Sequence, residues 1–560
     1  MDYRVWNDRY DEGVPRQLDY PEVPLFHFLE ESARRFPEKP CTIFKGAQIS
    51  YQEMNNLTDR LAAGLVDLGV QKGDRVGILI PNTPQFVMAY FAVLKAGGVV
   101  AATNPMYTER EIKHQANDSG MKLMIVMSNY YEKLKNVQPE TGIKQLVVTN
   151  IKESLPGFTA LLFTLLKEKP GGFRVRLRDN DLWMPEVITR YQSEDRPALE
   201  IGPEDMAIFQ YSGGTTGIPK AAIGLHRNLV ANTIQILHWI TSADQGEEVV
   251  LMAIPLYHVY GMVAGMNYGL ASASTLVMVP DPRDLKDLLG NLEKYQTTIF
   301  PAVPALYNAI NSYQPVRDGK YDLSAIKACI SGSAPLMRET KETFEELTGG
   351  VVFEGYGLSE APTATHCNPN LGENRTGSIG LPFPDVDARI IDLDDEVTEL
   401  PPGQIGELVI KAPQVFKGYH NMPTETRNAI RDGWLYTGDI GRMDDEGYFY
   451  LVDRKKEVIK PGGFQVWPRE VEEIIQDHPA VQEAAVAGVP DPHRGETVKA
   501  WLVPASGEKV DLDDLKKWCG ERMAKYKIPT EFEIRDQLPR THVGKLLRRE
   551  LVKEHTEISN

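Results

Sequence analysis

The chain has 560 residues, of which 42% are hydrophobic and 25% charged, a composition typical of a soluble globular protein with more than one domain. Its 78 acidic and 61 basic residues give a formal net charge of −17, so we expect no nucleic acid partner. No apolar run approaches the ~20 residues that cross a bilayer, and the acidic start of the sequence has no apolar stretch, so we expect no secretory signal. The four cysteines lack metal-ligand spacing, which predicts reduced thiols in a cytoplasmic protein.

Strands and helices alternate along the first half of the chain. Ser50 and Glu53 form a capping-box pattern, and apolar residues at helical spacing follow until Gly69. Strands are predicted at 74–82, 99–105, 121–126 and 145–150, with a helix at 86–98. This alternation predicts an α/β fold with a mostly parallel, helix-covered sheet.

The pattern changes after Arg454. A helix at 467–478, strands at 481–489 and 498–504, a helix at 511–523 and a strand at 531–536 predict a small α+β unit.

A glycine-rich segment, QYSGGTTGIPKA at 210–221, follows the short apolar strand MAIF. Glycines let backbone N–H groups turn toward an anion, while Ser212, Thr215 and Thr216 add donors and Lys220 adds a positive charge. These features predict a phosphate cradle, although a glycine-rich surface turn has the same composition. A Walker-type P-loop fits badly, because Pro219 removes an N–H and no Ser or Thr follows the lysine.

Three further motifs are weak when taken singly. In GYGLSE at 355–360, Tyr356 could stack on a nucleotide base and Glu360 could bind Mg²⁺. An ordinary turn with a solvated glutamate would have the same sequence pattern. In WLYTGD at 434–439, the carboxylate of Asp439 could accept hydrogen bonds from the two hydroxyls of a ribose, or it could simply cap a turn. In PRTHVGK at 539–545, Lys545 is either functional or simply solvated.

Six motifs in order resemble one enzyme superfamily. YSGGTTGIPK, SGSAPL, GYGLSE, WLYTGD, DRKKEVIKPGGFQVWPREVE and PRTHVGK together resemble the adenylate-forming superfamily of acyl-CoA synthetases, adenylation domains and luciferases, over roughly residues 25–550. The double glycine of YSGGTTG, with YDLSAIKACISGSAPL and HPAVQEAAVAGVPDPHRGETVKA, is most similar to bacterial long-chain fatty acid–CoA ligases. The resemblance implies a large N-terminal AMP-binding domain, 1–455, and a small mobile C-terminal domain, 456–560.

The resemblance also implies roles for individual residues. The ATP- and AMP-binding set would be Ser212, Gly213, Gly214, Thr215, Thr216, Gly217, Lys220, Gly332, Ser333, Ala334, Tyr356, Gly357, Ser359, Glu360, Asp439, Arg454 and Lys545. Within this set Lys545, Glu360 and Thr215 are expected to be catalytic, with Glu360 holding Mg²⁺ and Asp439 and Arg454 holding the ribose. Lys456 would be the hinge, and Gly462 and Gly463 would line the CoA tunnel. Ala221 and Ser359 depart from the commoner glycine and threonine, but neither change removes a phosphate contact or a hydroxyl.

The implied activity is a ligase of fatty acid metabolism that uses ATP, Mg²⁺ and coenzyme A. A fatty carboxylate is ionised at pH 7, so it needs no general base to attack ATP. We expect acyl-AMP and pyrophosphate first, then a swing of the small domain about Lys456 and transfer of the acyl group to CoA. An aryl-CoA ligase, a fatty acyl-AMP ligase, a P-loop motor and a membrane fatty-acid transport or acyl-binding protein are the alternatives.

The apolar segment PLYHVYGMVAGMNYGL at 255–270 is a candidate wall of the acyl pocket. Tyr257, His258, Gly261 and Gly265 are its predicted pocket residues, and glycines at 261, 265 and 269 would leave room for a chain. Ordinary core packing would produce the same pattern. The sequence is compatible with acyl chains of different lengths, with a degradative or a biosynthetic pathway, and with any oligomeric state.

Residues 155–178 combine an apolar helical face with a basic cluster. Leucines and a phenylalanine at 155, 158, 161, 162, 165 and 166 share a face, and Lys167, Lys169, Arg174, Arg176 and Arg178 follow, opposed only by Glu168. This pattern predicts peripheral contact with anionic membrane at its inner face, unless the apolar face packs onto the protein body.

The pattern around Lys545 also suggests regulation. Pro539, Gly544 and Lys545 resemble the recognition pattern for lysine acetylation in this family, so a lysine acetyltransferase is an expected partner. Acetylation would remove the charge that the first step needs.

Overall fold

The computed structural model describes residues 4–212, 219–461, 465–491, 494–541 and 546–559. The chain divides into two compact units: one contains Asn7–Val386 and Lys411–Ile430, and the other contains Met1–Trp6, Asp387–Ile410 and Arg431–Asn560. These units do not coincide with the predicted domains, since residues 387–410 and 431–455 group with the C-terminal part. The predicted boundary between residues 455 and 456 coincides with the expected hinge, Lys456, and it stays a prediction.

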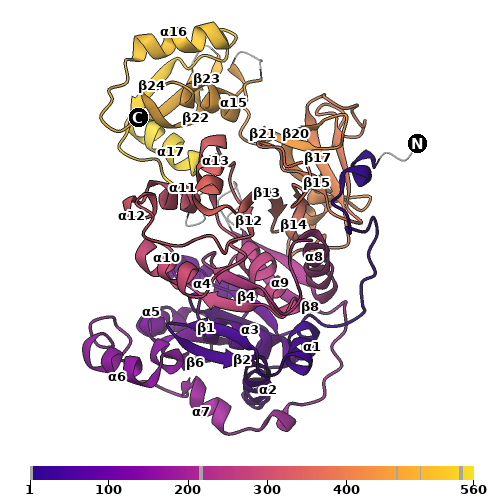
Figure 1. The fold of residues 1–560 in the computed structure, drawn as a ribbon, viewed down its shortest axis with the longest axis vertical. Helices are drawn as coiled ribbons and strands as arrows, with labels where there is room; N and C mark the ends of the chain where they lie inside the picture. The colour runs from indigo at the N-terminus through magenta and orange to yellow at the C-terminus, as the bar shows by residue number, and fades with distance from the viewer. Residues whose placement is uncertain (1–3, 213–218, 462–464, 492–493, 542–545, 560) are drawn as a thin grey trace. The chain divides into compact units, whose positions relative to one another are not determined.

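The first unit is built on a sheet whose central strands are parallel (Figure 1). In order across the sheet its strands are β18 (Gly418–Tyr419), β9 (Lys220–Leu225), β8 (Met206–Ser212), β4 (Val99–Ala102), β3 (Arg75–Leu79), β5 (Leu123–Met127), β6 (Gln145–Thr149) and β7 (Leu182–Trp183). Strands β8, β9 and β18 pair antiparallel at one edge. The mostly parallel, helix-covered sheet expected from the sequence is confirmed.

Two smaller sheets complete the strands of this unit. One runs in the order β10 (Val249–Met252), β11 (Thr275–Met278), β1 (Pro40–Phe44) and β2 (Ala47–Ser50). The other runs β12 (Ala328–Ser331), β13 (Val351–Leu358), β14 (Ala361–Cys367) and β15 (Leu381–Pro382). Parallel bridges through Ile299 connect β10 to β12.

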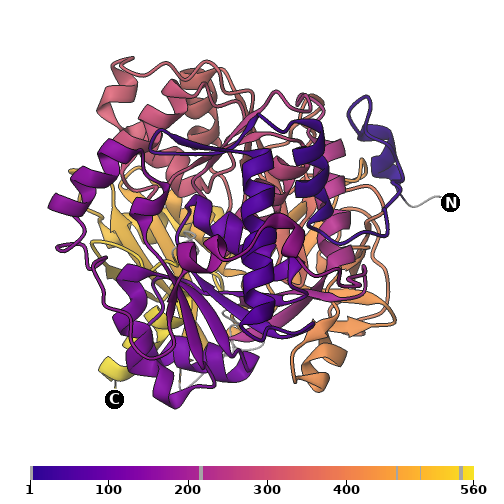
Figure 2. The same cartoon turned by 90° about the horizontal axis from the view of Figure 1, so that it is seen from below.

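Helices cover these sheets, and Figure 2 shows those of the N-terminal half in indigo and purple. They are α1 (His27–Arg35), α2 (Tyr51–Asp67), α3 (Pro84–Lys95), α4 (Glu109–Ser119), η2 (Ser128–Tyr130), α5 (Tyr131–Val137), η3 (Gln138–Glu140), η4 (Ile151–Ser154), α6 (Gly157–Leu166), α7 (Met184–Thr189), η5 (Ser193–Asp195), α8 (His226–Trp239), η6 (Tyr260–Asn267), α9 (Tyr268–Ala271), α10 (Leu285–Lys294), α11 (Pro304–Ser312), α12 (Gln314–Arg317), α13 (Arg338–Thr348) and α14 (Pro423–Ala429). Helix α2 begins where the sequence predicted, because the Ser50 hydroxyl accepts a hydrogen bond from the Glu53 N–H at 3.2 Å. Helix α3 is buried along its whole length against α2 and strands β3 and β4.

The second unit contains η1 (Val5–Arg9) in part, two sheets and three helices among its described residues. One sheet has β16 (Asp387–Ile391), β17 (Gly406–Lys411), β20 (Trp434–Met443), β19 (Ile430–Arg431) and β21 (Phe449–Arg454). The other has β22 (Val481–Asp491), β23 (Gly495–Pro504) and β24 (Glu531–Ile534), with helices α15 (Pro468–Gln476), α16 (Leu512–Arg522) and α17 (Arg548–Ser559). The predicted helices and strands after Arg454 are confirmed.

Cys41, Cys329, Cys367 and Cys519 are all buried and unbridged. Within the described ranges, no helix has both the length and the apolar character that spanning a bilayer requires.

Candidate active site

Lys220 lies at the base of a β-hairpin. Strands β8 and β9 pair antiparallel with Ser212 opposite Lys220, so the two ends of the glycine-rich segment are held side by side. A Walker P-loop leads from a strand into a helix, whereas the segment here leads from β8 into strand β9. The structure therefore excludes the P-loop alternative.

Glu360 lies at the tip of a second hairpin. Leu358 of β13 pairs with Ala361 of β14, so Ser359 and Glu360 form a two-residue turn. The Glu360 carbonyl accepts the Phe416 N–H at 2.8 Å, and its carboxylate oxygen Oε1 accepts the Tyr419 hydroxyl at 2.7 Å. The turn and these two contacts fix the direction of the Glu360 carboxylate.

Tyr419 connects Glu360 with Lys220. Strand β18 pairs with β9, placing Tyr419 opposite Ala222, and the Lys220 ammonium lies 5.4 Å from the centre of the Tyr419 ring. The Lys220 ammonium also forms an ion pair with Glu425 at the start of α14. Sequence reasoning missed Tyr419 and Glu425, because their partners lie far away along the chain and no local pattern marks them.

The carboxylate of Glu360 fits a magnesium ion that is held mainly by a polyphosphate. No cluster of three or more His, Cys, Asp or Glu side chains suitable for a metal occurs among the described residues. Magnesium is commonly held by one or two carboxylates together with substrate phosphates and water. Tyr419 engages Oε1 of the half-buried Glu360 and thereby orients the carboxylate.

Residues 332–334 follow the carboxyl end of β12. This strand pairs in parallel with β13, which carries Tyr356 and Gly357. A Cβ added at Gly332 would lie 3.6 Å from the Gly355 carbonyl oxygen, so the two predicted adenine-binding stretches adjoin. Ser333 is exposed and lies in the left-handed region with φ of 69°, an unusual conformation for a residue with a side chain.

Buried polar groups support this part of the site. The Tyr260 ring lies beneath Gly332, at 3.2 Å from a Cβ built there, and its hydroxyl donates to the Ile330 carbonyl at 2.7 Å. The Glu354 carboxylate accepts the N–H groups of Leu336 at 3.3 Å and Gly377 at 2.8 Å. Burial raises the pKa of Tyr260 well above its usual value, so the hydroxyl stays a donor.

Asp439 and Arg454 form a cross-strand ion pair. They are register partners on β20 and β21, and Arg454 Nε lies 2.6 Å from Asp439 Oδ1. The Asp439 side chain is 5% exposed and that of Arg454 is 38% exposed, so the carboxylate is sheltered while the guanidinium reaches water. The structure brings together the two residues that the resemblance assigns to the ribose.

Lys456 lies in an exposed turn between two anchored neighbours. Lys455 pairs with Glu396 at 2.6 Å and Glu407 at 2.7 Å, and Glu457 pairs with Arg548. The Lys455 and Glu457 ion pairs fix the chain on either side of the predicted hinge.

Several predicted site residues lie outside the described residues. These are Gly213, Gly214, Thr215, Thr216, Gly217, Gly462, Gly463 and Lys545. Their assigned roles stay predictions.

The predicted acyl-pocket segment forms a buried π-helix, η6, which continues into α9. A Cβ at Gly261 would lie 2.5 Å from the Pro255 carbonyl oxygen, at Gly265 2.6 Å from Met252, and at Gly269 2.4 Å from Leu276. The expectation that these glycines leave open space is therefore wrong at the positions their side chains would take, because neighbouring atoms fill them. The glycines allow η6 and α9 to pack closely on β10 and β11.

Tyr257 and His258 are half-buried in the loop before η6. The Tyr257 carbonyl accepts from the Gln210 amide at 3.3 Å, and His258 Nδ1 accepts the Tyr260 N–H at 3.2 Å. Burial raises the pKa of Tyr257 to about 12. Both residues keep their assignment to the acyl pocket as a prediction.

Comparison with known sequences defines the class. Residues 29–420 match the family described as AMP-binding enzyme, and residues 470–545 match the AMP-binding enzyme C-terminal domain. The chain belongs to the AMP-binding enzyme family, as its motifs indicated.

Individual relatives are similar over almost the whole chain. A long-chain-fatty-acid–CoA ligase of Bacillus subtilis (strain 168) is 42% identical over 558 residues, covering 99% of this chain and 98% of the relative. One from Escherichia coli O6:H1 is 35% identical over 554 residues, covering 98% of each. The crystal structure of ATP-bound MatB from Rhodopseudomonas palustris matches with a TM-score of 0.82 and 28% identity, over 96% of this chain and 100% of that one.

Proposed function

We propose that this protein is an ATP-dependent long-chain fatty acid–CoA ligase. The observation that carries the proposal is its similarity, over 98–99% of its length, to ligases named for this activity. The reaction has two halves. A fatty carboxylate and ATP give acyl-AMP and pyrophosphate, and then CoA and acyl-AMP give acyl-CoA and AMP.

The first half-reaction joins two anions. A carboxylate oxygen bonds to the α-phosphorus while the bond to the β-phosphate oxygen breaks, and no proton needs to be removed at pH 7. The barrier is therefore mainly electrostatic, and fixed positive charge and N–H donors lower it. Lys220, Lys545 and the hydroxyl and N–H groups of 212–217, Thr215 among them, are the residues proposed for this task.

Glu360, oriented by Tyr419, is the residue proposed to hold magnesium. When bound, the ion would neutralise phosphate charge. Tyr356, Gly357, Ser359 and the stretch from Gly332 to Ala334 are assigned to the base and phosphate of the nucleotide.

Asp439 and Arg454 are proposed to bind the ribose hydroxyls. Asp439 offers acceptor oxygens, and Arg454, whose side chain is 38% exposed, holds the Asp439 carboxylate.

The second half-reaction forms the thioester. The CoA sulfur bonds to the acyl carbon, AMP leaves with the former carboxylate oxygen, and the thiol proton goes to solvent. We propose that the C-terminal domain, 456–560, turns about Lys456 between the two steps and that Gly462 and Gly463 then line the route of the thiol. Tyr257 and His258 are assigned to the wall of the acyl site.

The location and regulation of the enzyme are part of the same proposal. We place it in the cytoplasm with peripheral contact to the inner membrane face, where its substrates partition, and expect a lysine acetyltransferase to silence Lys545.

The experiment is substrate-dependent release of AMP and pyrophosphate from ATP. Acids from acetate to stearate, with benzoate and coumarate, are compared with and without CoA. Activity that is greatest on long alkyl acids, with full turnover only when CoA is present, supports the proposal. Preference for aryl acids, or turnover only with a holo carrier protein, would instead indicate an aryl-CoA ligase or a fatty acyl-AMP ligase. Absence of AMP with every acid would favour an acyl-binding or transport protein.

A further inference from the structure

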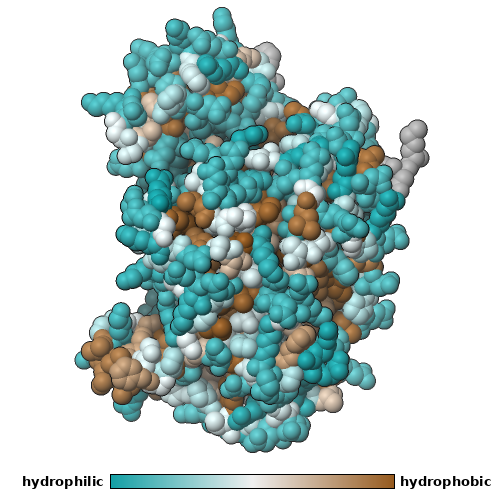
Figure 3. All heavy atoms as spheres, viewed as in Figure 1, coloured by the Kyte–Doolittle hydropathy of each residue, from teal (hydrophilic) through white to brown (hydrophobic). Residues whose placement is uncertain are grey.

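Helix α6 presents leucine and phenylalanine side chains to solvent. None of its ten residues is buried, and Phe158, Leu165 and Leu166 are 74%, 69% and 66% exposed. Leu161 and Leu162 are also exposed. Figure 3 shows these residues as a brown patch at the lower left, over α6. The alternative that this face packs onto the body is therefore wrong, and the patch is of the kind that marks an interaction surface.

The helix is anchored through its other side. Phe163 contacts Phe173 edge to face with ring centres 5.3 Å apart, and the Arg174 guanidinium donates to the Thr164 carbonyl at 3.2 Å. The Glu168 N–H donates to the Phe163 carbonyl at 2.8 Å. The turn at 168–174 thus holds α6 in place while Phe158, Leu165 and Leu166 face outward.

A basic surface adjoins the exposed helix. Lys167, Lys169, Arg174, Arg176 and Arg178 are all exposed, in a chain whose net charge is −17. Arg174 pairs with Glu168, and Arg178 pairs with Glu132. Glu168 is buried and also pairs with Lys152. Lys167, Lys169 and Arg176 form no ion pair with any described residue, so their charges remain available to an external anion.

We propose that α6 and residues 167–178 form a docking surface for an anionic lipid membrane. The exposed leucines and Phe158 would enter the acyl boundary, while Lys167, Lys169 and Arg176 would contact lipid headgroups. At ten residues, α6 is too short to cross a bilayer and suited to lie in the interface. This inference rests on the proposed function, because docking would bring the enzyme to fatty acid dissolved in the membrane.

Charge complementarity favours lipid over a protein partner. Helix α6 carries no charge, and its two hydroxyls belong to threonines, of which Thr164 bonds back to the Ala160 carbonyl at 2.8 Å. It therefore offers little polar specificity, which a membrane interface does not require and a specific protein interface does. The cationic cluster at its C-terminal end matches the negative surface of a lipid leaflet.

Vesicle binding by the full chain tests the proposal. The protein is sedimented with phosphatidylcholine vesicles that contain or lack phosphatidylglycerol. Two triple variants are compared with the wild type: Phe158→Ser, Leu165→Ser, Leu166→Ser in one, and Lys167→Glu, Lys169→Glu, Arg176→Glu in the other. Each cation near an anionic lipid surface raises the binding constant about fivefold. We therefore expect the wild type to bind anionic vesicles at least about tenfold more tightly than neutral ones. Each triple variant should lose that preference.

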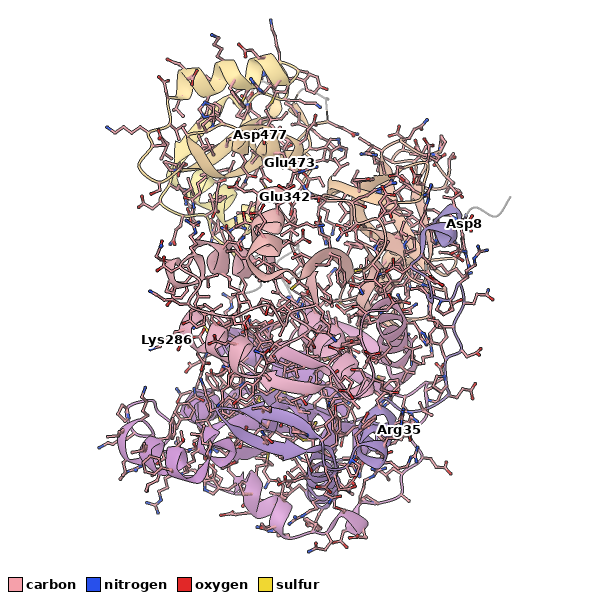
Figure 4. All side chains as sticks on the ribbon, in the orientation of Figure 1. Asp8, Arg35, Lys286, Glu342, Glu473 and Asp477 are labelled. Atoms are coloured by element: carbon pink, nitrogen blue, oxygen red, sulfur yellow. The ribbon has the colours of Figure 1, made fainter. Side chains whose placement is uncertain are left out.

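A matched control uses exposed cations elsewhere. Lys286, Lys509 and Lys525 are exposed and form no ion pair with a described residue, and Figure 4 labels Lys286 on α10. Reversing these three charges changes the net charge by the same amount as the charge-reversal test variant. Because α6 and residues 167–178 stay intact, vesicle binding should remain at the wild-type level. Equal loss in the control would overturn the local assignment and leave only net charge.

A site-specific label reports insertion directly. Since all four native cysteines are buried, Leu165→Cys can be labelled selectively with a polarity-sensitive dye. Its emission should shift to the blue with anionic vesicles, whereas a dye on Leu371→Cys, at another exposed leucine, should not respond. No shift at position 165 would overturn the proposal.

Two readouts separate failure of docking from failure of the proposed function. Ligase activity on a water-soluble acid should be the same in the wild type and in both triple variants, while activity on fatty acid embedded in anionic vesicles should fall several-fold in the variants. If the wild type binds neutral and anionic vesicles equally, or if α6 variants only dissociate an oligomer in solution, the docking surface is overturned even though the enzyme is active. In the second case a second copy of the chain occupies α6.

Discussion

The Tyr419 hydroxyl donates a 2.7 Å hydrogen bond to Glu360 Oε1, which links edge strand β18 to the turn between β13 and β14. A hydrogen bond from a neighbouring hydroxyl can orient a carboxylate that binds a metal. We expect Tyr419→Phe to raise the magnesium concentration needed for half-maximal pyrophosphate release about tenfold or more, because loss of such a partner costs 10–100-fold in metal affinity or activity. A magnesium titration at fixed ATP measures this.

Tyr436→Phe is the control for that variant. The Tyr436 hydroxyl donates to the Glu396 carbonyl at 3.1 Å in the other compact unit. The Tyr436→Phe variant therefore also loses one hydrogen bond. Its magnesium titration should match the wild type. An unchanged titration in Tyr419→Phe would show that the bond seen here does not orient Glu360 for the metal.

Lys220 has a carboxylate partner, Glu425, that would compete with a bound phosphate for its charge. Replacing Lys220 with Met should lower the rate of acyl-AMP formation about 10²–10³-fold, as removal of one transition-state contact typically does. Replacing Glu425 with Gln should instead lower KM for ATP, by about two- to fivefold, because a partly exposed ion pair is worth at most about 1 kcal/mol. Steady-state pyrophosphate release measures both effects. A raised KM in Glu425→Gln would mean that Glu425 positions Lys220 rather than competing for it.

Gly357 is required by the close approach of another strand. A Cβ at this position would lie 1.4 Å from the Thr363 carbonyl oxygen, so Gly357→Ala must displace β13 from β14. We expect this variant to lose about 1–3 kcal/mol of stability and most of its adenylation activity, since the same hairpin carries Glu360. Thermal unfolding and pyrophosphate release measure the two effects.

Gly290→Ala provides the comparison for Gly357→Ala. Gly290 lies within α10, where nothing comes within 4 Å of an added Cβ. Alanine should therefore stabilise the helix slightly, by about 0.5–1 kcal/mol, and leave activity unchanged. If Gly357→Ala behaves like this control, the hairpin can relax around the new methyl group.

Local signals predicted much of this structure. Ser50 and the apolar repeat marked α2. The glycines and lysine of 210–221 marked the segment between β8 and β9 as a candidate phosphate site, which stays a prediction. Tyr419 escaped notice because its strand, β18, is only two residues long and its partner Glu360 is 59 residues away. Glu425 escaped notice because its partner Lys220 is 205 residues away. The helical and strand patterns of apolar residues in a sequence do not indicate such long-range contacts between side chains.

Composition alone could not decide the surroundings of two apolar segments. Glycines at 261, 265 and 269 are equally compatible with open space and with close packing, and only the positions of Pro255, Met252 and Leu276 show the latter. The face of α6 could have been core or surface, because its sequence pattern is the same in both cases.

His226 couples stability to pH through its burial. The Leu25 N–H donates to His226 Nδ1 at 3.0 Å, so the folded chain holds a neutral ring, and burial lowers its pKa to about 4. In the unfolded chain the ring titrates near 6.5, so between pH 6.5 and 4 the unfolded state binds more protons and folding weakens as pH falls. The loss from pH 7.5 to pH 5 should reach about 2 kcal/mol.

His226→Asn removes this titration while keeping an acceptor for the Leu25 N–H. We expect the variant to be less stable than the wild type at pH 7.5 but to lose less stability on acidification, as measured by urea midpoints at several pH values. His238→Asn, on the exposed side of the same helix α8, should keep the wild-type pH profile. If His226→Asn loses as much stability as the wild type between pH 7.5 and 5, other groups cause the acid sensitivity and the buried His226 ring does not.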